Sequence, residues 1–478
     1  MASGERSVLH RQHHGCLLIS SPQGHSGKTV VTIGLCRVLK QKGLTVQPFK
    51  KGPDYIDPSW LTAATGRSCR SLDFFLIPKD KLLDSFHRAC READVSVIEG
   101  AMGLYDGLDF VEYGSSAQVA RLLNSPILLV VNTTRMTGSI AAMVTGYQHF
   151  ESDTPIAGVI LNHVSGARHE TKLKTSVEQH CGIPVVGSVP KDPDLHISER
   201  HLGLVPSLET EESETIIDRI GRKMEAYLDL DKILSIARTP TPPLPLREGD
   251  GVRESQVRMA KIGVLLDKAF HFYYPENFEA LTRAGAELIF INSLKDRLPE
   301  IDGLYIGGGF PEFFLEELEG NHSLKRDIAD RVEGGLPLYA ECAGLMYLCQ
   351  SISWKGRSYK MVGLIPADVE LSEKPQGHGY VIAEVVEENP LFPVGLTLRG
   401  HEFHHSGLLP LHDLSCVYRI KRGEGIISKR DGVVYKNLFA SYIHLHALGT
   451  PEWAKGLVSL ASKRRRTDPH VFPSEGPV

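Results

Sequence analysis

The sequence predicts an α/β protein of two units, the first of which is a doubly wound parallel sheet. Three observations lead to this prediction. Short apolar runs rich in Val, Ile and Leu alternate with helical patterns along most of the chain. A Pro-rich and then charged segment, residues 237–259, interrupts this alternation. Each side of that linker contains one strand-to-helix turn that carries reactive side chains.

The composition is that of a globular protein. The chain has 478 residues, of which 42% are apolar and 23% are charged, with a net charge of −5. This mild charge gives no reason to expect nucleic acid as a partner. No apolar run approaches the ~20 residues that a membrane span needs, and the polar, His-rich start predicts no signal peptide. Eight widely spaced Cys favour reduced thiols, and hence a cytoplasmic location.

The first reactive turn follows the apolar run at residues 16–19. A loop of small residues leads to Ser26-Gly27-Lys28-Thr29, where a helical pattern begins. This is the phosphate-binding loop arrangement, in which loop N–H groups and a Lys contact phosphates while a Thr hydroxyl contacts Mg²⁺. We therefore expect nucleotide contacts from Gly24, Ser26, Gly27, Lys28 and Thr29. Pro22 stands where the standard pattern has its first Gly, so an ordinary strand–loop–helix is the alternative.

Acidic residues follow two further predicted strands. The Gly- and Pro-containing loop 52–58 carries Asp54 and Asp57, and the run Val95–Ile98 ends on Glu99, with Asp106 in the next loop. Acids at the carboxyl ends of strands in a nucleotide-binding sheet are placed to bind Mg²⁺ or its water. These four carboxylates could converge near Lys28 and support ATP, magnesium and carboxylate activation. For loop 52–58 taken alone, a solvated turn is the alternative.

Further strands are predicted at residues 125–132, 156–162 and 184–190. Asn162 ends the second of these, where it could contact the nucleotide base or act as a turn or cap residue.

Beyond the linker, strands are predicted at residues 261–267, 286–292, 303–309 and 336–340. Cys342 follows the last of them at a sharp turn into a helix, which exposes a nucleophile and favours its thiolate. Gly308 and the Ala343 N–H could stabilise an oxyanion, and His444 is the expected general base. A buried, inert Cys342 is the alternative, and Cys349 is expected as a core residue in the same helix. The His cluster at residues 399–406 is interpreted as a loop or substrate contact.

Nine strings together resemble one family over residues 17–448. They are SGKT, FKKGPDYIDP, IEGAMGLYDG, ERHLGLVP, FHFYYPEN, YIGGGFPE, YAECAGLMYL, RGHEFHHS and SYIHLH. The chain resembles the cobyrinic acid a,c-diamide synthase family, the glutamine amidotransferases of cobyrinate and hydrogenobyrinate. The resemblance implies a dethiobiotin-synthetase-like P-loop ATP domain at 1–236, the linker 237–259, a class I glutamine amidotransferase domain at 260–450 and a tail at 451–478.

The resemblance also implies an activity. ATP would phosphorylate the a and c acetate carboxylates of a cobyrinate-type tetrapyrrole, and L-glutamine would supply ammonia through a thioester on Cys342, activated by His444. Lys28 and Thr29 would bind ATP. Thr29, Asp54 and Glu99 would hold Mg²⁺, Asp54, Asp57 and Asp106 would serve catalysis, and Tyr55 and Ile56 would contact the substrate. The usual class I pattern has Glu two residues after the His, where this chain has His446.

Several alternatives remain open from the sequence. The same amidation could act on sirohaem or nickel-sirohydrochlorin. A non-enzymatic P-loop switch and a plain glutamine hydrolase are further candidates, although the intact Cys342, His444 and Glu99 disfavour the former. The oligomeric state is undetermined, with a homodimer among the options.

Overall fold

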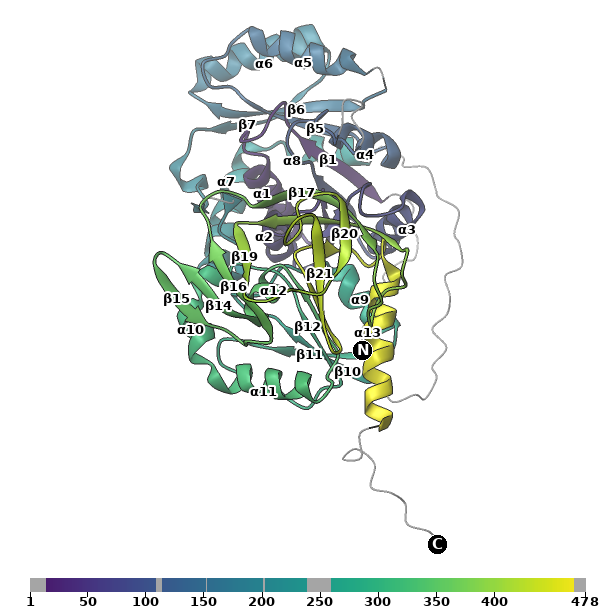
Figure 1. Cartoon of the computed structure of the whole chain (residues 1–478). Helices are drawn as coiled ribbons and strands as arrows, with labels where there is room; N and C mark the ends of the chain where they lie inside the picture. The colour runs from purple at the N-terminus through teal and green to yellow at the C-terminus, as the bar shows by residue number, and fades with distance from the viewer. Residues whose placement is uncertain (1–13, 109–113, 152, 201–202, 239–258, 468–478) are drawn as a thin grey trace, which may run out of the picture. The chain divides into compact units, whose positions relative to one another are not determined.

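The computed structural model describes residues 14–108, 114–151, 153–200, 203–238 and 259–467 (Figure 1). The chain forms two compact units. Unit 1 comprises Met1–Phe74 and Lys79–Glu248, and unit 2 comprises Phe75–Pro78 and Gly249–Val478. Most of the predicted linker 237–259 lies outside the described residues. Among the helices that are described, none is both long and apolar enough to cross a membrane.

Unit 1 is built on a seven-stranded parallel sheet in the order β3-β2-β4-β1-β5-β6-β7. Its strands are β1 (Gly15–Ser20), β2 (Val46–Lys51), β3 (Arg70–Leu72), β4 (Val95–Glu99), β5 (Ile127–Asn132), β6 (Ile156–Val164) and β7 (Val185–Pro190). Strand order reverses at β1, which pairs with β4 on one side and β5 on the other. Ligands of such sheets bind outside the carboxyl ends of the strands at this reversal point.

Helices connect these strands and complete the doubly wound fold, as predicted. They are α1 (Lys28–Gln41), α2 (Ile56–Thr65), α3 (Lys79–Cys90), α4 (Ser116–Leu123), α5 (Ser139–Phe150), α6 (Ala167–Cys181), α7 (Ser213–Tyr227) and α8 (Leu230–Ala237). The short pieces are the 3-10 turns η2 (Pro193–Leu195) and η3 (Ser207–Glu209) and the hairpin β8 (Glu199–Arg200) with β9 (Gly203–Leu204). A core of strand and helix residues, Trp60 and Met224 among them, excludes water and so positions the loops.

Unit 2 has a ten-stranded mixed sheet in the order β11-β10-β12-β13-β22-β21-β20-β17-β18-β23. Strands from β11 (Ala286–Ile291) through β10 (Ala260–Leu265), β12 (Gly303–Ile306) and β13 (Leu338–Glu341) to β22 (Leu438–Ser441) are parallel. The rest are antiparallel: β21 (Arg430–Tyr435), β20 (Cys416–Arg422), β17 (Gly377–Val385), β18 (Thr397–His404) and β23 (His444–Leu445).

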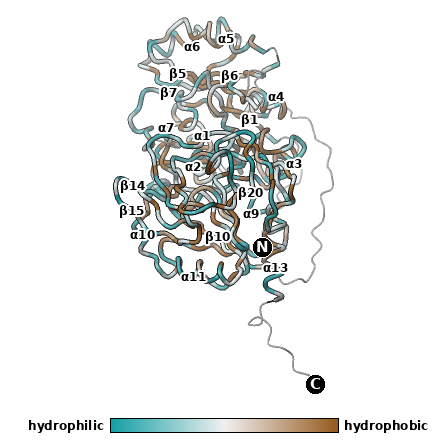
Figure 2. The backbone as a smooth tube through the Cα atoms, viewed as in Figure 1, coloured by the Kyte–Doolittle hydropathy of each residue, from teal (hydrophilic) through white to brown (hydrophobic). Residues whose placement is uncertain are grey.

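A second, four-stranded sheet joins β15 (Arg357–Lys360), β14 (Cys349–Trp354), β16 (Ile365–Leu371) and β19 (Ser406–Pro410). The helices of unit 2 are α9 (Pro275–Arg283), α10 (Leu315–Gly320), α11 (His322–Glu333), α12 (Ala343–Leu348) and α13 (Pro451–Thr467), with the 3-10 turn η4 (Pro311–Phe313). Helix α11 carries both hydrophilic and hydrophobic residues (Figure 2) and buries Leu324, Ile328 and Val332, which are four apart and lie on one face.

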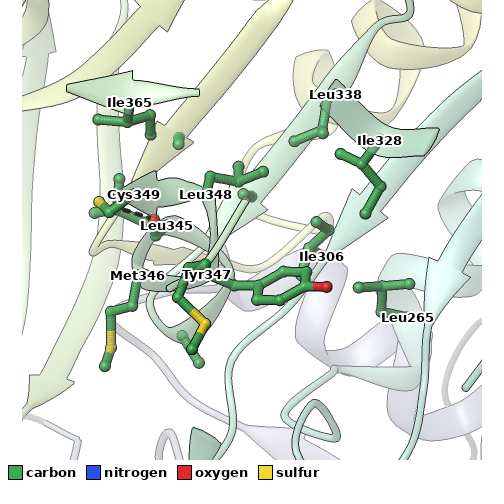
Figure 3. Packing of buried hydrophobic residues seen from close by; sticks show 14 of the residues in the cluster. Leu265, Ile306, Ile328, Leu338, Leu345, Met346, Tyr347, Leu348, Cys349 and Ile365 are labelled. Atoms are coloured by element: carbon green, nitrogen blue, oxygen red, sulfur yellow. Dashed lines mark hydrogen bonds between the residues drawn. The ribbon is translucent and has the colours of Figure 1, made fainter. Parts of the chain in front are cut away.

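Helix α12 is shorter than the sequence pattern suggested. It ends at Leu348, and Cys349 begins β14, so the expectation that Cys349 lies within the helix is wrong. Its thiol donates to the Leu345 carbonyl in the buried cluster around Tyr347 (Figure 3). The expectation that Cys349 is a core residue is confirmed, because none of its surface is exposed.

Residues after 450, expected as a tail, include helix α13. Its Trp453 is fully buried, and the indole packs edge-on against the rings of Tyr305 and Tyr339 at 5.1 and 5.3 Å. Complete burial of a Trp side chain against two aromatic rings contributes strongly to stability. The helix is therefore an integral part of the core of unit 2.

Candidate active sites

The phosphate loop of unit 1 lies at the sheet's reversal point, between β1 and α1. Gly27 has φ +88°, a left-handed conformation that L side chains avoid. A Cβ placed on Gly27 would meet the Asn162 Nδ2 at 2.2 Å. Asn162 is buried near the carboxyl end of β6. Its Nδ2 donates to the Ser26 carbonyl at 2.9 Å, and its Oδ1 accepts the His163 N–H. The Asn162 amide therefore supports the loop that is expected to bind phosphate.

Lys28 and Thr29 open α1 and face the loop after β4. Lys28 Nζ donates to the Met102 carbonyl at 2.9 Å, and burial lowers the pKa of this ammonium, as does the charge of Lys50. The Thr29 hydroxyl donates to Glu99 Oε1 at 2.6 Å. Parallel pairing of β1 with β4 brings the two loops together, because both leave the sheet at the same edge.

Lys50, the penultimate residue of β2, is the centre of a buried charge cluster. Its Nζ lies 2.5 Å from Asp57 Oδ2, 3.1 Å from Glu99 Oε1 and 3.7 Å from Asp54 Oδ2. Burial alone would lower the pKa of Lys50, but the three carboxylates together raise it well above its usual value. The sequence shows two Lys at the end of this strand, but the prediction gave site roles to the acids and none to Lys50.

The three acids of this cluster differ in charge state. Burial, followed by the neighbouring Asp57, raises the pKa of Asp54 to about 7. Burial also raises the pKa of Glu99. For Asp57 the effect of burial is outweighed by the Lys50 ammonium, and its pKa is lowered. At neutral pH the site therefore holds one carboxylate that is firmly ionised and one, Asp54, that is poised to exchange a proton.

Asp106 lies in the loop after β4 but supports that loop from within. Its Oδ2 accepts the Gly103 N–H at 2.7 Å. Gly103 packs so closely that an added Cβ would meet the Pro22 carbonyl oxygen at 2.6 Å. Asp106 thus fixes the loop whose Met102 carbonyl contacts Lys28, and the structure brings it to the same edge of the sheet as Glu99.

Tyr55 and Ile56 are half-buried at the start of α2. Asp54 Oδ1 accepts the Ile56 N–H at 2.8 Å, so this carboxylate also caps the helix. Gly24 lies in the phosphate loop, where a Cβ would meet nothing within 4 Å. A cavity of about 210 Å³ adjoins this loop. It is lined by Pro22, Gln23, Ser26, Val131, Asn132, Thr134, Met136 and Met143.

The oxygen atoms expected to bind magnesium belong to Thr29, Asp54 and Glu99. Glu99 Oε2 is buried and accepts no hydrogen bond from the described residues, and Oε1 already holds the Thr29 hydroxyl. No cluster of three or more His, Cys, Asp or Glu suited to a metal occurs in the part of the chain that the structure describes. Mg²⁺ keeps several waters and takes only one or two protein carboxylates, so Thr29 and Glu99 fit its needs.

Cys342 occupies the strained turn between β13 and α12 in unit 2. Its φ of +50° and ψ of −107° are rare for a residue with a Cβ, and such strain clusters at functional sites. Its N–H donates to the Ser441 carbonyl at 2.8 Å, and its Sγ lies 4.0 Å from the Phe403 carbonyl oxygen. Gly344 is equally constrained, since a Cβ there would meet the Ile306 carbonyl oxygen at 2.5 Å.

The resting thiol differs from the expectation that this turn favours thiolate. Burial raises the pKa of Cys342 to about 12, and the opposing hydrogen bond from the Ala343 N–H is too weak to reverse this. Only 5% of the residue is exposed. The helix N-terminus therefore does not ionise the thiol by itself, and a base must remove the proton.

His444, the expected base, lies on the short strand β23 beside β18. It pairs with His401, and the two rings stack at 4.8 Å with an interplanar angle of 7°. Burial lowers the pKa of His444 well below its usual value, and His401 and His404 lower it further. His444 is therefore neutral at pH 7, as a general base must be. Phe403, whose carbonyl faces the Cys342 thiol, lies two residues from His401 on β18.

The glycine turn after β12 completes this site. A Cβ on Gly308 would meet His444 Cε1 at 2.5 Å and Nε2 at 3.2 Å, so the turn and the imidazole are in direct contact. The Gly344 N–H donates to the Gly307 carbonyl at 3.1 Å, which joins the turn to the start of α12. Gly308 and Ala343 are thus gathered around Cys342 and His444.

The 399–406 segment, expected as a loop or substrate contact, is not a loop: it lies on β18 and the start of β19, and its other His residues have local roles. His404 stacks on the Tyr442 ring at 3.6 Å, and its Nδ1 hydrogen-bonds the Ser406 carbonyl at 2.8 Å. His401 Nε2 lies 2.9 Å from the Tyr274 hydroxyl. Stacking and backbone bonding hold these rings in place, and the described residues form no metal cluster here.

Comparisons with known proteins agree with this division. Residues 17–205 match the CobQ/CobB/MinD/ParA nucleotide binding domain, and residues 261–452 match the CobB/CobQ-like glutamine amidotransferase domain. The chain is 42% identical over 94% of its length to a cobyrinate a,c-diamide synthase of Magnetococcus marinus, covering 97% of that protein. A cobyrinate a,c-diamide synthase of Archaeoglobus fulgidus is 41% identical, over 94% of this chain and 98% of that protein.

A third relative, the cobyrinate a,c-diamide synthase of Methanosarcina barkeri, is 40% identical over 96% of this chain and 97% of that protein. Among solved structures, PurLQS from Thermotoga maritima is 16% identical with a TM-score of 0.34, covering 43% of this chain and 98% of that chain. A nucleotide-binding half joined to a glutaminase half defines a glutamine-dependent amidating ligase. Within that class, the chain belongs to the cobyrinate a,c-diamide synthase family.

Proposed function

We propose that this protein amidates the a and c acetate carboxylates of a cobyrinate-type tetrapyrrole, with ATP as energy source and glutamine as nitrogen donor. The observation that carries the proposal is the strained Cys342 at the start of α12, joined through the Gly307–Gly308 turn to a neutral, buried His444, on a chain 42% identical to a cobyrinate a,c-diamide synthase. The acids around Lys50 in unit 1 support the ATP-dependent activation of the substrate carboxylate.

In unit 1 a substrate carboxylate attacks the γ-phosphorus of ATP, which gives an acyl phosphate and ADP. Lys28 and the loop N–H groups around Gly27 bind the phosphates. Thr29 and Glu99 would hold Mg²⁺, whose charge stabilises that of the phosphates when it is bound. Asp57 fixes the Lys50 ammonium, which is placed to offset the charge of the substrate carboxylate. Asn162 supports the loop through Ser26 and lies where it can also contact the base.

In unit 2 His444 accepts the Cys342 proton, and the sulfur attacks the glutamine carboxamide carbon. The N–H groups of Gly308 and Ala343 would hold the oxyanion. Collapse expels ammonia, which takes its proton from His444, and leaves a thioester that water hydrolyses to glutamate. The ammonia displaces phosphate from the acyl phosphate and gives the amide. Asp54, with a pKa raised to about 7 by burial, is suited to accept a proton at this step, and Asp106 keeps the loop in place.

The test separates the two halves. Cys342→Ala is expected to abolish synthesis with glutamine and to retain synthesis with ammonium salts, because only the first route needs the thiol. Cys349→Ala is the matched control, since it removes a buried thiol seven residues away. Loss of both activities in Cys342→Ala alone would contradict separate roles.

The substrate is tested by mass. Cobyrinate incubated with ATP and glutamine is expected to show two carboxyl-to-amide conversions. The same conversions on sirohaem or nickel-sirohydrochlorin, and none on cobyrinate, would replace the substrate in this proposal while keeping the reaction.

A further inference from the structure

The acid that assists His444 is not where the class I pattern puts it. His446 occupies that position, two residues after His444. Its Nδ1 accepts the Leu448 N–H at 3.2 Å, so the ring proton lies on Nε2, which is 3.6 Å from Glu276 Oε2. The His446 ring also packs on Tyr274 at 4.5 Å. His446 therefore contacts Glu276 on α9 and Tyr274, the residue before that helix.

Glu341, the last residue of β13, lies directly behind the base. Its Oε2 is 3.9 Å from His444 Nδ1, and only 1% of the residue is exposed. We propose that Glu341 is the positioning residue that orients His444 and stabilises its protonated form, in place of the usual downstream Glu. The inference rests on the proposed glutaminase function and names the missing third member of its catalytic group.

Three hydrogen bonds fix the Glu341 carboxylate in this place. Oε1 accepts the Tyr339 hydroxyl and the Leu445 N–H, each at 2.9 Å, and Oε2 accepts the Tyr305 hydroxyl at 2.9 Å. The backbone N–H of Leu445, the residue after His444, thus donates to the same carboxylate that the His444 ring faces. Because Cys342 follows Glu341 in the chain, one strand end presents both the nucleophile and the acid that supports its base.

The ring geometry divides the two nitrogens of His444 between two tasks. Nδ1 faces Glu341, whereas Nε2 lies on the side of Gly308, 3.2 Å from the position of a Cβ there. A proton held on Nδ1 by the acid leaves Nε2 as the acceptor on the side of the glycine turn. When Nε2 then takes the thiol proton, a buried imidazolium forms, and the anion at 3.9 Å offsets its charge.

Other titratable groups face this pair. His444 is influenced by His401 and His404. Glu341 influences Tyr273, Tyr305, Tyr339, Tyr418 and Cys342. None of these described groups that face Glu341 is a cation. Burial raises the pKa of the Glu341 carboxyl to about 7, and a proton taken up by His444 would favour its ionised form.

The experiment compares Glu341→Gln with Glu276→Gln, which alters an equally buried Glu that faces His446 instead. For Glu341→Gln we expect kcat with glutamine to fall by about 10² to 10⁴, with KM for glutamine and ammonium-dependent synthesis retained. The acidic side of the pH–rate profile of Glu341→Gln with glutamine is expected to move to lower pH, because loss of the anion lowers the pKa of His444. Glu341→Asp is expected to recover part of the rate. Glu276→Gln should leave the acidic side of the pH–rate profile unchanged.

A readout independent of turnover is the pH dependence of Cys342 alkylation by iodoacetamide. Glu341→Gln should slow alkylation and shift its profile, while Tyr339→Phe, which keeps the carboxylate, should do so less. Unchanged glutamine turnover and alkylation in Glu341→Gln, or a larger shift in Glu276→Gln, would overturn the proposal. If the wild type makes no amide from glutamine, the proposed function fails, while the alkylation profiles still decide the role of Glu341.

Discussion

The contact between Gly27 and Asn162 gives a prediction with a calculable magnitude. Gly27→Ala places a Cβ 2.2 Å from Asn162 Nδ2 at a backbone φ of +88°. The left-handed conformation costs about 1–2 kcal/mol for a residue with a Cβ. The displaced amide loses its bond to the Ser26 carbonyl, worth about 0.5–1.5 kcal/mol. We expect the free energy of unfolding of unit 1 to fall by about 2–3 kcal/mol.

Urea denaturation without nucleotide measures this loss, with Gly146→Ala in α5 as the matched control, because a Cβ there meets nothing within 4 Å. In the Asn162→Ala background the clash is absent, so Gly27→Ala should cost less by about 1 kcal/mol, a coupling that a double-mutant cycle detects. With ammonium as nitrogen donor, the KM for ATP should also rise in Gly27→Ala. Equal costs in both backgrounds, or no cost, would refute the reasoning.

Three further predictions follow from buried groups. Lys50→Met leaves the carboxylates of Asp57 and Glu99 without their cation. In urea unfolding it should destabilise unit 1 by about 3–5 kcal/mol at pH 8, and by less at pH 5 because carboxylates begin to take up protons there. The control Lys42→Met, at an exposed ion pair, should cost below about 1 kcal/mol. Burial raises the pKa of Asp431 to about 7, so the folded state binds its proton more tightly than the unfolded chain, and stability falls as pH rises from about 4 to 7. Asp431→Asn keeps the acceptor for the Gly432 N–H and should gain stability relative to wild type across that range; parallel pH curves would contradict this. Trp453→Ala should cost about 3–5 kcal/mol in thermal or urea unfolding of unit 2, whereas the same loss in exposed Lys455→Ala would show a nonspecific effect.

Local patterns predicted much of the fold and of both sites. The apolar runs ending at Ser20 and Glu99 are strands because continuous Val, Ile and Leu suit a sheet buried on both faces. The Lys28 and Cys342 turns were predicted because strand-to-helix turns carry a local signal of small residues. The antiparallel strands of unit 2 and the end of α12 at Leu348 were not, because short apolar segments there fit either structure.

The candidate sites show the same division. Lys28, Thr29, Glu99 and Cys342 could be predicted from their own neighbours in the chain. The charge cluster around Lys50 could not, because it depends on β2 and β4 pairing in register, Lys50 opposite Glu99. Nor could the high pKa of the Cys342 thiol, since burial by distant strands opposes the local effect of the helix N-terminus.

The sequence by itself determined the types of chemistry that the chain carries: a phosphate loop, acids at strand ends and a Cys–His pair. These follow from residue type and local spacing, which act over a few bonds. The tertiary structure alone decided which groups support them, such as Asn162 behind Gly27 and Glu341 behind His444. Those partners lie far apart in sequence or point in directions that only packing fixes, so their meeting depends on the whole sheet.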